Sequence, residues 1–156
     1  QYMDFARGER PEEVAGEIAR LVDKAFLTPV QGGAVNPERI AAFFASDPGR
    51  AVLTSPTLRR EFKFSILVPA ADYLPGAEEG EQVLLQGVVD CFFEEGDGLT
   101  VVDFKTDRVT GEAVLRRAEE YRPQLLAYSR ALEEITGKQV RRRVLWFFSE
   151  DRAVEI

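Results

Sequence analysis

Apolar residues in the first half of the chain recur with a helical period and then with the period of a strand. Between residues 11 and 26 they are spaced three and four positions apart behind a Pro-Glu-Glu start, which predicts an amphipathic helix. Asn36 before a proline predicts the cap of a short helix, and residues 47–49 (Asp-Pro-Gly) should break it before a brief helical turn. Residues 58–68 alternate, which predicts a strand with an apolar side formed by Phe62, Phe64, Ile66 and Val68.

The second half of the chain predicts a loop, a hairpin, a helical region and a last strand. Residues 69–82 are rich in proline, glycine and acidic side chains, and residues 86–105 read as two strands joined by a turn at Gly96-Asp97. Residues 111–137 look helical, with a break at residues 121–123. The part after the break is expected to face the core with Leu125, Leu126, Ser129 and Leu132. With a strand at residues 140–148, this order predicts an α/β fold, a mixed β-sheet core flanked by α-helices, as one domain over residues 1–156.

The predicted hairpin carries polar residues inside its strands. With Gly96-Asp97 as a two-residue turn, Asp90 lies opposite Asp103. Alternation then places Lys105 on the same face as the two aspartates, together with Val88, Phe92 and Val101. The other face is expected to be core, formed by Val89, Cys91, Phe93, Val102 and Phe104.

Two carboxylates directly across a strand pair repel each other, and a divalent cation between them removes the conflict. The chain has no histidine and one cysteine, so a metal site must be built from oxygen ligands, which suit Mg²⁺ or Mn²⁺. Lys105 would then hold the attacking water or neutralise charge on a phosphate oxygen, as phosphodiester hydrolysis requires. A solvated carboxylate pair beside a surface lysine is the other interpretation, and the spacing alone does not decide between them.

Four more residues are candidates for the same site. Glu61 lies on the preceding strand and could supply a further ligand, while Gln124 and Tyr128 share one helix face and could point together at a sugar, a base or the lysine. Gly87 would leave room for a backbone or phosphate, or for tight packing. Each of these residues also has a purely structural interpretation as exposed strand, helix flank or packing point.

These motifs together resemble the RecB-type branch of the PD-(D/E)xK nuclease family. Residues 85–90 (LQGVVD) resemble its strand with the first metal aspartate, residues 102–107 (VDFKTD) its Asp-Tyr-Lys-Thr block, and residues 124–128 (QLLAY) its Gln-Leu-x-x-Tyr motif. Residues 60–64 (REFKF) resemble the upstream glutamate strand, and the resemblance extends over nearly the whole chain, most closely to the C-terminal nuclease domain of AddA-type helicase-nucleases.

The resemblance implies a restriction-endonuclease-like fold and a metal-dependent deoxyribonuclease in double-strand-break repair. Asp90, Asp103 and the carbonyl of Phe104 would bind Mg²⁺, with Mn²⁺ as a substitute and no iron-sulfur cluster, and Lys105 would be catalytic. The DNA would be a single strand fed by an ATP-dependent helicase in the same longer chain, paired with an AddB-like subunit. The family also carries a histidine on a helix before the first strand, so this histidine-free chain is expected to be a fragment with weakened metal binding and activity. The alternative is a catalytically incomplete module for DNA binding or subunit docking.

The net charge of −7 argues against a surface that grips DNA everywhere, so DNA contact must be local. Candidate phosphate contacts are Arg59, Arg60, Arg116, Arg117 and Arg122, whereas Arg141 to Arg143 are expected to be ordinary solvated charges and Trp146 to be core. The sequence shows neither a membrane-spanning run nor a signal segment, so a cytoplasmic location is expected.

Overall fold

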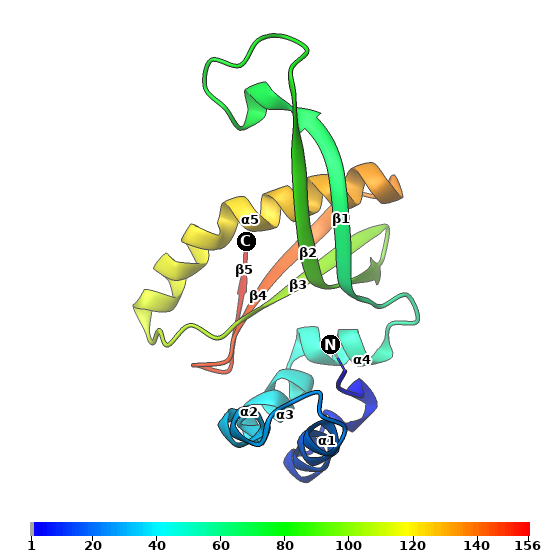
Figure 1. Cartoon of the computed structure of the whole chain (residues 1–156), viewed down its shortest axis with the longest axis vertical. Coiled ribbons are helices and arrows are strands. Elements are labelled where there is room, and N and C mark those ends of the chain that lie inside the picture. Colours follow the sequence, from blue (N-terminus) through cyan, green and yellow to red (C-terminus); the bar gives the residue numbers. More distant parts are fainter. Residues whose placement is uncertain (1) are drawn as a thin grey trace.

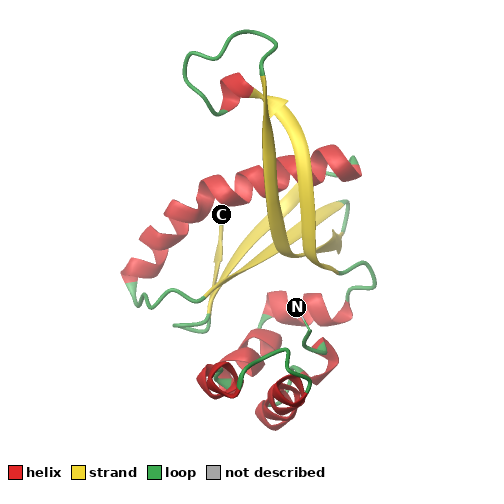
Figure 2. Ribbon diagram, in the orientation of Figure 1, coloured by secondary structure: helices red, strands yellow, loops and turns green. Residues whose placement is uncertain are grey.

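The computed structural model describes residues 2–156, which build a five-stranded sheet in the order β1-β2-β3-β4-β5 (Figures 1 and 2). The strands are β1 (Arg59–Pro69), β2 (Gln82–Glu95), β3 (Gly98–Lys105), β4 (Val140–Phe147) and β5 (Arg152–Glu155). Strands β3 and β4 are parallel, and the other neighbours are antiparallel. The predicted mixed sheet is therefore confirmed, with β5 as a strand that the sequence pattern did not indicate.

Helices cover both faces of the sheet. On one face lie α1 (Pro11–Asp23), α2 (Pro29–Ala34), α3 (Pro37–Ala45) and α4 (Asp47–Thr54), and on the other lies α5 (Glu112–Thr136), which links β3 to β4 (Figure 1). One buried cluster joins α5 to the sheet through Leu125 and Leu132, and a second joins α3 and α4 to it through Phe43 and Val52. Both faces of β3 are thus core. Short 3₁₀ turns occur at Phe5–Arg7 and Ala70–Asp72, and no helix within residues 2–156 is both long and apolar enough to cross a membrane.

Local capping sets the helix starts on the α1–α4 side. The side chain of Asn36 accepts a hydrogen bond from the Arg39 backbone N–H, as a cap before Pro37 predicts. The short helix α3 ends at Ala45 and another helix follows, as expected, although residues 47–49 form the first turn of α4, which the Ser46 side chain caps, rather than the break itself. The unpredicted helix α2 begins with a reciprocal cap between Thr28 and Gln31.

Helix α5 is continuous, so the predicted break at residues 121–123 is wrong. Pro123 lies inside the helix. Buried residues on both sides of it, Val114 and Leu125 among them, hold the helix on the sheet, and this packing offsets the hydrogen bond that proline cannot donate. Leu126, expected on the core side, is instead 49% exposed. Gly137 ends the helix in the left-handed region, at φ 71°, as a glycine cap predicts.

The hairpin of β1 and β2 leaves the rest of the sheet partway along β2 (Figure 1). Strands β2 and β3 pair in the predicted register, from Glu95 with Gly98 to Cys91 with Val102. The next residue toward the N-terminus of β2 is Asp90, and from there on β2 pairs with β1 alone, to which Phe92 and Cys91 are also paired. The point where β2 and β3 separate is called the fork below.

Side-chain alternation changes at the fork. Val89 packs in the α5 cluster and Cys91 in the opposite cluster, although both were expected on one face, and Val88 is 37% exposed. The change in alternation occurs where Glu61 of β1 lies opposite Asp90. Glu61 has a φ of 51°, which is rare for a residue with a side chain. The local turn of the backbone swings the two-stranded arm outward and opens the sheet at Asp90.

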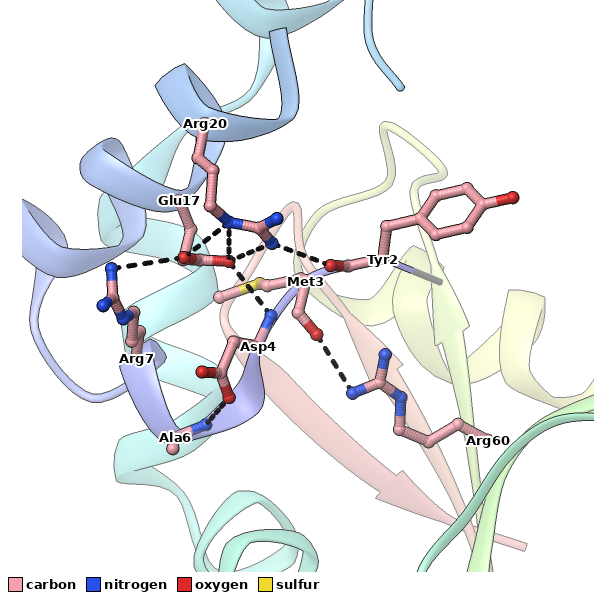
Figure 3. A network of polar contacts seen from close by, with 8 residues as sticks. All are labelled: Tyr2, Met3, Asp4, Ala6, Arg7, Glu17, Arg20 and Arg60. Atoms are coloured by element: carbon pink, nitrogen blue, oxygen red, sulfur yellow. Dashed lines mark hydrogen bonds and ion pairs between the residues drawn. The ribbon is translucent and has the colours of Figure 1, made fainter. Parts of the chain in front are cut away.

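A buried carboxylate fixes the N-terminal segment against α1 and β1 (Figure 3). Glu17 is 1% exposed and accepts hydrogen bonds from Arg20, at 2.7 Å, and from the backbone N–H of Asp4, at 3.1 Å. Arg20 also donates to the Tyr2 carbonyl, and Arg60 on β1 donates to the Met3 carbonyl. The hydrogen bonds from Arg20 lower the pKa of Glu17 despite its burial.

Candidate active site at the fork of the sheet

Asp90 occupies the point where β2 and β3 separate. Its Oδ2 accepts a hydrogen bond of 2.8 Å from the backbone N–H of Phe104 on β3. The Asp90 side chain thus makes a hydrogen bond to β3 just beyond Cys91 and Val102, the last residues of β2 and β3 that pair through their backbones. Asp90 therefore joins the diverging strands while its carboxylate stays beside the fork.

Asp103 is nearly enclosed, with 2% of its surface exposed. Its Oδ2 lies 2.5 Å from the Lys105 Nζ in a buried ion pair. Burial raises the pKa of Asp103, and the charge of Asp90 raises it further, against the contact with Lys105. The effect of Asp90 on Asp103 shows that the two carboxylates lie within electrostatic reach of each other.

Burial also raises the pKa of Asp90, and the negative charge of Glu61 adds to the increase, while the hydrogen bond from Phe104 opposes it. Glu61 thus lies within electrostatic reach of Asp90, on the strand where the sequence placed it. Asp90 and Asp103 both lie near the Lys105 ammonium, whose one positive charge does not balance two carboxylates. Such a deficit of positive charge suits a divalent cation.

Lys105 is held on three sides. Its ammonium contacts Asp103, donates a 2.9 Å hydrogen bond to Gln124 Oε1, and lies 3.7 Å from the ring centroid of Tyr121. Gln124 Nε2 in turn donates to the Tyr128 hydroxyl at 2.7 Å. Two of the candidate residues from α5 therefore form one chain of hydrogen bonds to the lysine, and they point at it rather than into solvent.

Tyr121 and Asp107 belong to the same network, although sequence reasoning gave neither a role. The Tyr121 hydroxyl donates to Asp107 Oδ2 at 2.9 Å, and Arg117 Nε donates to Asp107 Oδ1 at 2.7 Å. Burial alone would raise the pKa of Asp107, but these hydrogen bonds lower it overall. Tyr121 stood inside the expected helix break, and that expectation concealed the fact that it is three residues from Gln124 on one continuous helix.

The backbone of Phe104 offers one more oxygen at the fork. The N–H and C=O of a strand residue point to the same edge, and the Phe104 N–H points to Asp90. The adjacent Lys105 carbonyl accepts a hydrogen bond from the N–H of Phe148, just beyond β4, at the opposite edge. The Phe104 carbonyl is therefore directed to the side of Asp90.

The donor set fits a divalent cation that also takes water. Within residues 2–156, no three side chains of His, Cys, Asp or Glu lie close enough together to hold a metal ion by themselves. Asp90 and Asp103 supply two carboxylates whose pKa values burial raises, and the Asp103 carboxylate is also paired with Lys105. Mg²⁺ commonly binds through one or two carboxylates and keeps several water ligands, so the arrangement is compatible with it.

Most of the candidate phosphate-binding arginines are occupied by protein groups. Arg117 and Arg122 are ion-paired to carboxylates of the loop or of α5. Arg141 and Arg142 pair with Asp97 and Glu155, and Arg143 donates to Ser129. Arg60 donates to a backbone carbonyl and lies over the Phe5 ring. Trp146 is 2% exposed and is core, as expected.

Comparison with known protein families shows which family this chain belongs to. The family model of the PD-(D/E)XK nuclease superfamily matches residues 4–155. The chain belongs to the PD-(D/E)XK nuclease superfamily. In this nuclease chain, the family assignment and the mixed sheet with its flanking helices agree with the resemblance noted in the sequence.

Similar proteins are subunits of ATP-dependent helicase/nucleases, of the AddA type. The one from Acetivibrio thermocellus is 40% identical over 97% of this nuclease chain. The proteins of the same name from Desulforudis audaxviator and Clostridium botulinum are 39% and 34% identical over 94% and 100% of it. The chain spans 12% of the length of each of these relatives.

Proposed function

We propose that this chain is a metal-dependent deoxyribonuclease domain that hydrolyses phosphodiester bonds in single-stranded DNA. One observation carries the proposal. Asp90 and Asp103, on strands that separate between them, converge beside Lys105 in a buried setting that raises the pKa of both carboxyl groups. A purely structural fold gains nothing from placing two destabilised carboxylates at an opening in its sheet.

Asp90, Asp103 and the Phe104 carbonyl would hold Mg²⁺, or Mn²⁺ in its place. When bound, the cation polarises the phosphate and lowers the pKa of a bound water. Glu61 would reach the same site directly or through water.

Lys105 would place its ammonium against the attacking water or the phosphate oxygens that gain charge. Gln124 and the Tyr121 ring keep that ammonium aimed, because both contact it, and Tyr128 holds Gln124 in turn. In the reaction, the water oxygen bonds to phosphorus and the water gives up a proton to solvent, the bond from phosphorus to the leaving sugar oxygen breaks, and that oxygen takes up a proton.

The wider setting is proposed from the relatives. Their name joins a helicase and a nuclease, and this chain matches only 12% of their length. We infer that an ATP-dependent helicase portion of a longer chain feeds the single strand, that an AddB-like subunit is the partner, and that the complex works in double-strand-break repair in the cytoplasm. A motor that holds the DNA also explains how a domain with net charge −7 can act on it.

A second candidate is a nuclease-fold module that binds DNA or docks a subunit without turnover. Two observations favour it. The sequence has no histidine, and within residues 2–156 no three acidic, histidine or cysteine side chains form a ready metal site. Such a module would keep its function when Mg²⁺ is chelated, whereas the nuclease would lose it.

Cleavage of end-labelled single-stranded DNA tests the proposal, with Mg²⁺, Mn²⁺ or EDTA. The 156-residue chain is compared with a version extended upstream until it includes a histidine-bearing helix. Lys105→Met removes the ammonium and keeps an unbranched side chain of similar length, and Lys24→Met is the matched control because Lys24 is exposed at the end of α1. Thermal unfolding confirms that each variant is folded.

Metal-dependent cleavage that survives Lys24→Met and disappears in Lys105→Met is the expected result. An unchanged rate in Lys105→Met, or cleavage that persists in EDTA, contradicts the proposal. Folded chains that bind DNA and never cleave it favour the non-catalytic module.

A further inference from the structure

A cavity of about 600 Å³ lies at the carboxyl ends of β3 and β4, on the side of α2 and α3. Its volume is within the usual range for small-molecule sites. Most of the surface of its wall is apolar, and its polar lining residues carry two guanidinium groups and no carboxylate. The lining used below comprises Ile40 and Phe148 as apolar residues and Arg39, Thr106, Arg108 and Ser149 as polar ones.

The charge of this cavity is opposite to that of the chain. Arg108 is exposed, and within residues 2–156 it has no ion-pair partner. Its neighbour Asp107 does not neutralise it, because that carboxylate is bound to Arg117 and Tyr121. Arg39 donates to the Phe148 carbonyl and lies 3.8 Å from Asp151, which leaves part of its guanidinium donor set available. A basic cavity on a chain of net charge −7 selects an anion.

The aromatic wall of the cavity is fixed in place. The ring of Phe148 is half-buried, lies 5.8 Å from the Phe104 ring centroid, and meets Trp146 edge-on at 6.4 Å. Ser149 donates a 2.7 Å hydrogen bond to the Val109 carbonyl, which ties the two sides of the cavity together. A preformed apolar wall with an aromatic ring suits a nucleobase, because stacking needs a flat apolar face and no particular base.

The cavity begins where the candidate active site ends. Strand β3 ends at Lys105, and Thr106, the next residue, lines the cavity. Consecutive side chains point to opposite faces, so Lys105 and the cavity lie on either side of the same strand end. A nucleic acid strand that crosses the end of β3 would contact both.

We propose that this cavity is a nucleotide subsite for the single strand, adjacent to the bond that is cut at the fork. The base stacks against Phe148, and Arg108 with Arg39 binds the phosphate. The inference rests on the proposed nuclease function and adds to it a place where a nucleotide beside the scissile phosphate is held. A segment of protein is the other class of occupant that such a cavity could take.

Binding in EDTA tests the subsite without cleavage. Fluorescence anisotropy measures the affinity of the 156-residue chain for a labelled oligothymidylate and for an abasic oligomer of the same length, which keeps the phosphates and lacks the bases. The variants are Arg108→Gln, Phe148→Leu and the matched control Lys24→Gln, which removes one exposed charge outside the cavity. Thermal unfolding verifies the fold of each, and Arg108→Gln disturbs no packed side chain.

The wild-type chain should prefer the thymidylate oligomer by about fivefold or more, as one stacked base implies. Phe148→Leu should abolish that preference, and Arg108→Gln should lower the slope of log affinity against log salt by about 0.7, the value for one phosphate contact on a single strand. Lys24→Gln should change neither quantity.

Three results would overturn the inference and favour a protein segment as occupant. They are equal wild-type affinity for both oligomers, no measurable binding, and an Arg108→Gln variant whose salt slope is unchanged. Cleavage separates this failure from that of the nuclease proposal. A chain that cleaves with Mg²⁺ but ignores the bases refutes the subsite alone, and one that binds through the cavity but never cleaves refutes the nuclease alone.

Discussion

Replacing Gly87 by alanine tests how closely the β1–β2 arm packs on α5 beneath the active site. A Cβ atom at this position would lie 2.8 Å from Cε1 and Cζ of Phe64 and 3.2 Å from Cε1 of Tyr128. Both rings are buried, and they meet at 81° with centroids 5.9 Å apart. Propensity alone predicts that alanine stabilises a strand position relative to glycine, so the packing argument predicts the opposite sign.

The size of the effect follows from the contacts. Carbon atoms pack best at about 3.5–4.0 Å, so the ring of Phe64 must retreat by roughly 1 Å. Overpacking of this kind costs about 1–3 kcal/mol, which for a chain of this length lowers the melting temperature by about 2–12 °C. Tyr128 bonds Gln124, which bonds Lys105, so the displacement reaches the ammonium. A misplacement of that scale costs up to about 100-fold in rate.

Gly16→Ala is the matched control. Gly16 lies inside α1, and a Cβ there meets nothing within 4 Å. In this variant the free energy of unfolding should rise by about 0.5–1 kcal/mol, and the cleavage rate should stay at the wild-type value. Thermal unfolding by circular dichroism and metal-dependent cleavage well below the melting temperature measure the two effects. If Gly87→Ala melts at or above the wild-type temperature, the arm does not pack as described and the reasoning is wrong.

Three further predictions concern charge and positioning. Burial raises the pKa of Asp90, so the metal-free fold loses stability as pH rises through that raised pKa. Asp90→Asn should therefore resist urea better than the wild type at pH 8 in EDTA. Below the ordinary pKa of an aspartate, the two proteins should unfold at the same urea concentration. Arg20 lowers the pKa of Glu17, so the stability that the Glu17 carboxylate contributes is lost as pH falls. In urea unfolding, Glu17→Gln should lower the free energy of unfolding by about 3 kcal/mol at pH 7, and by progressively less in acid. Tyr121→Leu should reduce cleavage more than Tyr121→Phe, which keeps the ring over Lys105; equal rates would exclude that contact as a positioning device.

The register of the hairpin was predictable because a two-residue turn fixes which residues face each other. The pairs of β2 with β3 follow that rule up to Cys91 and Val102. The fork was not predictable, because it depends on the positive φ of Glu61 and on the Asp90 carboxylate that bonds Phe104. Neither feature changes the alternation of apolar residues, so Val88 and Val89 were assigned to the wrong surroundings.

The candidate residues of the site came from motif spacing, but their contacts did not. Lys105 and Gln124 stood out in the sequence, whereas the Tyr121 ring over the ammonium requires an unbroken helix across Pro123. Local propensity argues against that helix, and only its burial on the sheet outweighs the proline. The cavity beside Thr106 is likewise beyond sequence reasoning, because it joins the α2–α3 region to the segments that follow β3 and β4, which are distant in the chain.

Whether Asp90 and Asp103 share one divalent cation is best decided by titrating Mn²⁺ and following the free ion by electron paramagnetic resonance. We expect the wild-type chain to bind Mn²⁺ and both Asp90→Asn and Asp103→Asn to lose that binding, with added Mg²⁺ displacing the Mn²⁺ from the wild type. Asp97→Asn is the control, because Asp97 is exposed in the hairpin turn and pairs with Arg141. Equal Mn²⁺ binding by all four proteins would contradict a metal site at the fork.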